Sequence, residues 1–159
     1  MSRRPRSAVL LGLAAVALAP LAIAAPPPNT AIAVRAAWMR PSVAGGSGAA
    51  YLTIVNRGAA PDTLVSAGSP DAAQVSLHES RMVGQVMTMR SVSNLPIRSG
   101  GEIRFAPNGL HLMLQGLKRS FRTGDRLALV LTFAKAGQVR TWLAVRPDAS
   151  ADSMAGMKM

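Results

Sequence analysis

The sequence predicts an all-β protein with a single domain, built as a β-sandwich or barrel. Short apolar segments with an alternating pattern recur along the chain, and turn-forming residues separate them about every ten residues. Beyond the first 24 residues, no stretch carries the long helical period that would predict an amphipathic helix. A length of 159 residues suits one domain better than two.

The first half of the domain contains four predicted strands, which cover residues 32–40, 49–58, 63–69 and 72–80. The first strand ends before Pro41, and a loop rich in Gly and Ser follows it. The second strand has the clearest alternation, with Leu52 and Ile54 on one face. Tyr51 and Thr53 lie on the other face.

The second half continues with the segments 85–92, 95–98, 103–105 and 110–114, and with a closing hairpin over 125–145. The turn at Pro107-Asn108-Gly109 is well specified, because Asn-Gly favours positive φ. The closing hairpin is predicted to turn at Lys135-Ala136-Gly137. The connection 116–125 has room for a single helical turn.

Residues 1–24 are predicted to form a secretory signal peptide. Three arginines precede an apolar run, and Ala22-Ile23-Ala24 is a cleavage site of the A-x-A type. The alternative is an uncleaved membrane anchor, because the run approaches the length that spans a bilayer. Pro20 interrupts the run and no second apolar segment follows, so we predict cleavage before Ala25 and no stable membrane insertion afterwards.

The composition excludes several classes of function. The sequence contains no cysteine, which rules out thiol–disulfide exchange, Cys-x-x-Cys-His haem attachment and a blue-copper site with its thiolate ligand. There is no Gly-x-Ser-x-Gly motif and no pair of cooperating carboxylates, so we predict a binding protein and not an enzyme.

The chain is basic, with a net charge of +11 that falls to +8 when the leader is removed. Its arginines and lysines are scattered and its aromatic residues are few, which favours a solvated surface over a nucleic-acid site. The same charge would help to attract an acidic partner protein.

Residues 78–113 concentrate the side chains that bind soft metals. They include both histidines of the chain, His78 and His111, and four of its nine methionines: Met82, Met87, Met89 and Met113. Copper(I) prefers thioether sulfur and imidazole nitrogen, whereas magnesium and calcium bind oxygen and structural zinc usually binds thiolate. This inventory predicts a Cu(I) site.

Strand periodicity groups these side chains in pairs. His111 and Met113 are two residues apart in a predicted strand and so share a face, opposite Leu112 and its leucine neighbours. A hairpin turning near Val83-Gly84 would place His78 opposite Met89, and Ser80 opposite Met87. Directly opposed residues have Cβ atoms roughly 4.5–5.5 Å apart, which is close enough to share one ion.

The spacing of His78, Met89, His111 and Met113, with ten, twenty-one and one residues between them, resembles the signature of the periplasmic Cu(A) chaperones, PCu(A)C. The resemblance extends over most of the chain beyond the leader, including AAYLTIVNRG and PNGLHLMLQGLK. Members of that family often carry a methionine where this chain has Ser80. Met82 and Met87 are therefore candidates for an auxiliary ligand.

The resemblance implies a cupredoxin-like Greek-key sandwich over residues 25–147 and a periplasmic location. It implies that His78, Met89, His111 and Met113 bind Cu(I), with Cu(II) as a second form to be considered. It further implies delivery by ligand exchange to the Cu(A) centre of cytochrome c oxidase, directly or through a thiol-bearing Sco-like protein.

The sequence is also compatible with two other functions. One is a copper-buffering or resistance protein that stores the metal without directed delivery, and the other is a metal-free interaction module. Residues 148–159 are predicted to be a flexible tail that either captures metal through Met154, Met157 and Met159 or has no function. Met39, beside Trp38, is predicted to pack in the core.

Overall fold

The computed structural model describes residues 31–147, and all of its regular secondary structure is β. The strands are β1 (Ile32–Met39), β2 (Ser47–Asn56), β3 (Asp62–Gly68), β4 (Ala72–Val83), β5 (Val86–Ser91), β6 (Leu95–Ile97), β7 (Glu102–Arg104), β8 (Leu110–Leu117), β9 (Arg126–Phe133) and β10 (Gly137–Val145). The predicted all-β class is confirmed. The predicted leader and tail lie outside the described residues, and within 31–147 no helix has the length and hydropathy needed to cross a membrane.

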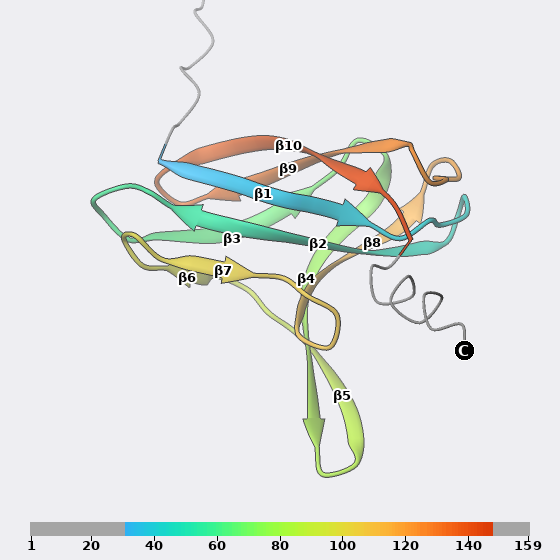
Figure 1. Cartoon of the computed structure of the whole chain (residues 1–159), viewed down its shortest axis with the longest axis horizontal. Coiled ribbons are helices and arrows are strands. Elements are labelled where there is room, and N and C mark those ends of the chain that lie inside the picture. Colours follow the sequence, from blue (N-terminus) through green and yellow to red (C-terminus); the bar gives the residue numbers. More distant parts are fainter. Residues whose placement is uncertain (1–30, 148–159) are drawn as a thin grey trace, which may run out of the picture.

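The strands form one curved sheet with the order β5-β4-β8-β2-β1-β10-β9-β3-β6, while β7 pairs with β2 beside β8 (Figure 1). Neighbours in the sheet are often distant in sequence: β2 pairs with β8, and β1 pairs with β10 in parallel. The end strands β5 and β6 are not paired with each other, so the sheet is not closed. β3 and β4 approach each other without hydrogen-bonded pairing, which gives the sheet two facing halves.

The core lies between these halves and consists mainly of alternate residues from β2, β8 and β9. Leu52 and Ile54 of β2 and Leu112 of β8 are at most 1% exposed. Met39 is fully buried, so its predicted packing role is confirmed. Each such side chain contributes about 1.5–3 kcal/mol through burial, which fixes the faces of the strands that carry the histidines.

The connection between β8 and β9 contains no helical turn. Phe121, which lies in this connection, is 1% exposed and forms an isolated antiparallel bridge with Ser42. The phenyl ring of Phe121 therefore anchors the connection to the core, and a tight turn follows it, in which the N–H of Asp125 donates to the carbonyl oxygen of Arg122 at 3.0 Å.

Candidate metal centre

Strand β4 forms the middle of the candidate site, because it pairs with β5 on one side and with β8 on the other. His78 in β4 lies directly opposite His111 in β8, and the two ring centroids are 5.9 Å apart with the planes inclined by 25°. Met113 lies opposite Ser76 on the same face. The predicted sharing of one face by His111 and Met113 is therefore observed, and the pairing of β4 with β8 adds His78 to them.

The register of the β4–β5 hairpin differs from the prediction. Met89 lies opposite Ser80, not His78, and Met87 lies opposite Met82, not Ser80. The turn consists of Gly84 and Gln85, with Gly84 at φ 64°, which is the glycine position of a two-residue type II′ turn. Moving the turn centre by one residue shifts each partner by two residues, so Met89 stays on the face that carries His78.

A cavity of about 210 Å³ brings together Met89 from β5 with His111 and Met113 from β8. Ser80 lies between these strands and is buried, and its small side chain leaves room for Met89 to reach across β4. His111 is only 6% exposed, whereas Met89 is 53% exposed. The cavity thus has a protected imidazole on its inner side and a thioether at its entrance.

The hydrogen bonding of His111 fixes which of its nitrogens is available. Nδ1 lies 3.0 Å from the carbonyl oxygen of Gly109, and a carbonyl only accepts, so Nδ1 carries the proton and donates it. In the neutral imidazole, Nε2 is then the nitrogen whose lone pair can bind a metal ion. The same carbonyl accepts the backbone N–H of Ser80 at 3.0 Å, so the turn before β8 positions both strands.

His78 does not line this cavity. Its Nε2 lies 2.9 Å from Oγ of Ser76, and its ring is stacked against that of His111. A serine hydroxyl can rotate to donate or to accept, so this contact holds the ring without fixing its protonated nitrogen. Met89, His111 and Met113 therefore meet in one cavity, and the fourth predicted ligand, His78, lies beside it on β4.

Several features of this site were absent from the sequence analysis. The Gly109 carbonyl belongs to the backbone and leaves no side-chain signal, although the Asn-Gly turn that holds it was predicted, with Asn108 at φ 64°. Arg40 and Tyr51 also line the cavity, but their strands lie far from the histidines in sequence. Within residues 31–147, no three His, Cys, Asp or Glu side chains cluster as a metal site, so the methionines are the further donors at hand.

The other methionines that the sequence analysis considered lie apart from the cavity. Met82 and Met87 face each other near the tip of the β4–β5 hairpin and are about half exposed. The predicted tail cluster of Met154, Met157 and Met159 lies outside the described residues.

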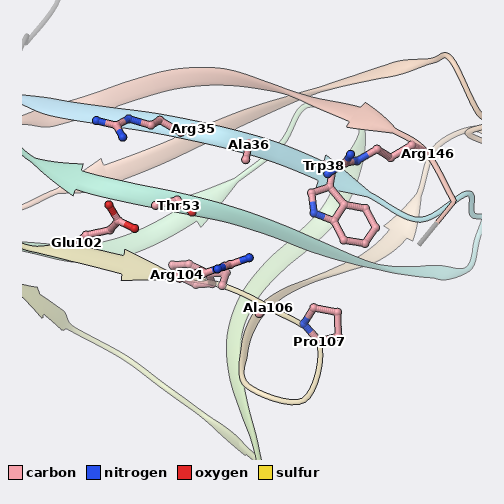
Figure 2. A pocket seen from close by; sticks show the side chains of 10 residues that line it. Arg35, Ala36, Trp38, Thr53, Glu102, Arg104, Ala106, Pro107 and Arg146 are labelled. Atoms are coloured by element: carbon pink, nitrogen blue, oxygen red, sulfur yellow. The ribbon is translucent and has the colours of Figure 1, made fainter. Parts of the chain in front are cut away.

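A larger cavity, of about 470 Å³, lies beside the candidate site and is basic (Figure 2). Arg35, Arg104 and Arg146 line it together with Glu102, and the guanidinium of Arg146 lies 4.9 Å from the centroid of the Trp38 ring. A bulge in β1 shapes its wall, where Ala36 adopts φ 48° between Arg35 and Trp38.

The two cavities are adjacent. Pro107 lines both of them, and the Trp38 ring of the basic cavity packs against Tyr51 of the candidate site with ring centroids 4.7 Å apart. The basic cavity therefore lies beside the cavity that Met89, His111 and Met113 line.

Residues 32–145 match the LpqE-like lipoprotein family. The protein Lxx21020 of Leifsonia xyli subsp. xyli, which is named as a lipoprotein, is 34% identical over 133 residues, covering 80% of this chain and 78% of that protein.

Two solved structures share the fold. The apo PmoF2 PCuAC domain is 25% identical with a TM-score of 0.62, over 75% of this chain and 93% of that domain. The Cu(I) form of DR1885 from Deinococcus radiodurans is 25% identical with a TM-score of 0.55, over 76% of this chain and 83% of that protein. The domain is thus cupredoxin-like, and because the family match spans nearly all the described residues, this chain belongs to the LpqE-like family.

Proposed function

We propose that this protein is an exported Cu(I) chaperone that binds one ion through His78, Met89, His111 and Met113. The observation that carries the proposal is the direct pairing of the two histidines on neighbouring strands, with both methionines on the same face. Similarity to the PCuAC domain of PmoF2 and to DR1885, which was solved in its Cu(I) form, supports the choice of metal.

The donor set suits Cu(I) outside the cytoplasm. Thioethers are soft and neutral, so they bind Cu(I) without first losing a proton and cannot be oxidised to disulfides. In His111, Nε2 is the nitrogen that would bind, because Nδ1–H is donated to Gly109. His78 would join the ion by giving up its contact with Ser76 and turning toward the cavity beside His111.

Delivery would proceed by exchange of ligands. Met89 is half exposed at the cavity entrance and would be released first, because a partner's donor atom can reach the ion from that side. The buried His111 would be released last. We propose a Cu(A) domain of cytochrome c oxidase or a Sco-like protein as the acceptor and the periplasm as the compartment. The names of the family and of the Leifsonia relative support export.

The first expected result concerns metal preference. The protein should bind about one equivalent of Cu(I) tightly and bind zinc far more weakly, because two of the four ligands are thioethers, which are poor zinc ligands. Competition titrations of the two metals on one preparation measure the difference. Tighter binding of zinc than of Cu(I) would contradict the copper assignment, and no binding of either would favour a metal-free interaction module.

The second expected result concerns docking of the acceptor at the basic cavity. Replacing Arg35 and Arg104 with Gln should slow Cu(I) transfer to an apo Cu(A) domain by about tenfold at low salt, because the cavity's positive charge would steer an acidic partner to the site entrance. The rates are measured by stopped-flow as a function of ionic strength, and the difference should vanish at high salt.

The control is Arg98→Gln with Arg122→Gln, which removes the same charge from exposed positions that line neither cavity. Equal slowing by both pairs would assign the effect to net charge and not to the cavity. No transfer to the Cu(A) domain or to a Sco-like protein, with the ion still tightly held, would favour the buffering function over delivery.

A further inference from the structure

The outer part of the β4–β5 hairpin forms an arm that stands away from the rest of the sheet. β4 pairs with β8 only as far as Glu79, and beyond that point its strand pairing is with β5 alone. Figure 1 shows this arm projecting below the other strands. An isolated two-stranded ribbon is marginal in water, so an arm of this kind needs specific side-chain contacts to keep its register.

Three methionines occupy one face of the arm. Met82 and Met87 are directly opposed, which places their Cβ atoms roughly 4.5–5.5 Å apart, and Met89 follows Met87 two residues along β5. Their exposed fractions are 55%, 50% and 53% respectively, so no core packing accounts for them. Ser80 and His78 lie on the same face of β4 as Met82. The three thioethers are therefore on the face that carries the candidate metal centre.

The opposite face of the arm carries its charged residues. Arg90 contacts Glu79 at 2.7 Å through both Nε and Nη2, and Arg81 lies 3.6 Å from the same carboxylate. The pair of Arg90 and Glu79 joins directly opposed residues of the two strands. The ion pairs also keep the guanidinium groups of Arg81 and Arg90 on the face away from the thioethers, so Arg40 at the inner cavity is the cation that lines a wall together with Met89.

We propose that Met82, Met87 and Met89 form a second Cu(I) site, the outer thioether site, which captures the ion and passes it to the inner centre. Met89 belongs to both ligand sets, so the ion would move by exchanging the sulfur atoms of Met82 and Met87 for His111 and Met113. All of these ligands bind as neutral donors, so the exchange needs no proton or electron and copper remains Cu(I). The proposal rests on the proposed copper function of the inner centre.

Two measurements test the outer thioether site. In protein labelled with ¹³C at the methionine methyl groups, with His111→Ala to disable the inner centre, added Ag(I) should shift the signals of Met82, Met87 and Met89 together.

In the otherwise unchanged protein, Met82→Leu with Met87→Leu should slow Cu(I) loading from a chelator complex about tenfold, because local capture is lost. The equilibrium affinity of the tight site should change less than about twofold, since neither residue lines its cavity.

The matched control is Val83→Leu with Val86→Leu, an opposed pair on the other face that is 59% and 65% exposed. If this control slows loading and the methionine pair does not, the arm acts through apolar contact and the proposal is wrong. Unshifted Met82 and Met87 signals with unchanged loading also overturn it. If the protein still binds one equivalent of Cu(I) tightly in either case, the proposed function of the inner centre is unaffected. Failure of the outer thioether site can therefore be distinguished from failure of the inner centre.

Discussion

Replacing Met113 with Leu is expected to weaken Cu(I) binding by at least about 100-fold while the fold remains intact. Loss of residues that only orient metal ligands costs 10–100-fold in affinity, so loss of a direct ligand should cost at least as much. The exchange of Met for Leu keeps volume and apolarity nearly constant, so unfolding should become easier by less than about 1.5 kcal/mol. Titration against a competing Cu(I) chelator, with thermal unfolding of the apo protein, measures both quantities.

Met39→Leu is the matched control, because Met39 is fully buried in β1 and lines neither cavity. It makes the same chemical change and should leave the copper affinity unaltered.

His111→Ala should weaken binding as strongly as Met113→Leu does. A chain ending at Pro147 should keep the tight equivalent, since none of the four proposed ligands lies beyond it. The assignment fails if that truncation abolishes tight binding while Met113→Leu leaves it untouched.

Replacing Asp62 with Ala is expected to lower the free energy of unfolding by roughly 2–4 kcal/mol. Asp62 begins β3 and is 7% exposed, and its carboxylate accepts backbone N–H groups from Thr63 at 2.7 Å, Lys135 at 2.9 Å and Ala136 at 2.8 Å. It therefore holds the turn between β9 and β10 against β3. Hydrogen bonds to a charged group contribute about 1.5–3 kcal/mol each, and part of that returns when the turn N–H groups bind water.

The stability that Asp62 contributes depends on pH, because folding changes the pKa of its carboxyl. Burial raises the pKa of the Asp62 carboxyl, but the backbone N–H groups of Lys135, Ala136 and Thr63 together outweigh it and lower the pKa below the ordinary value of 3.8. A carboxyl with a lower pKa in the folded state stabilises the fold fully above its unfolded pKa, and this stabilisation is lost as the pH falls through the folded value. The stability difference between the two proteins should therefore be constant near neutral pH and shrink below about pH 4.

Urea denaturation at several pH values measures this difference. Asp125→Ala is the control, because Asp125 is only half-buried and its carboxylate accepts one backbone N–H, from Arg122 at 2.9 Å, where that of Asp62 accepts three. Its ion pair with Arg119, at 3.6 Å, should add at most about 1 kcal/mol. An Asp62→Ala protein no less stable than the control variant would contradict the role assigned to the buried carboxylate.

The sequence by itself determined the strands and the faces of their side chains. The alternation in β2 and β8 separates Leu52 and Leu112, which are buried, from Tyr51 and His111 on the opposite face. The alternation of side chains between two faces is a local property of an extended chain. It is therefore unaffected when the predicted position of a turn is wrong by one residue. The hairpin turn was misplaced by one residue, yet Met89 remained on the face that carries His78.

Only the tertiary structure decided which strands are neighbours and how far each side chain reaches. The pairing of β4 with β8 brings His78 opposite His111 across a long stretch of intervening chain, and no local pattern specifies that choice. The same is true of Ser80, whose small side chain opens the way for Met89, and of the Gly109 carbonyl that orients the His111 ring. Contacts between distant segments depend on how the whole core packs, which is a property of the folded chain and not of any one segment.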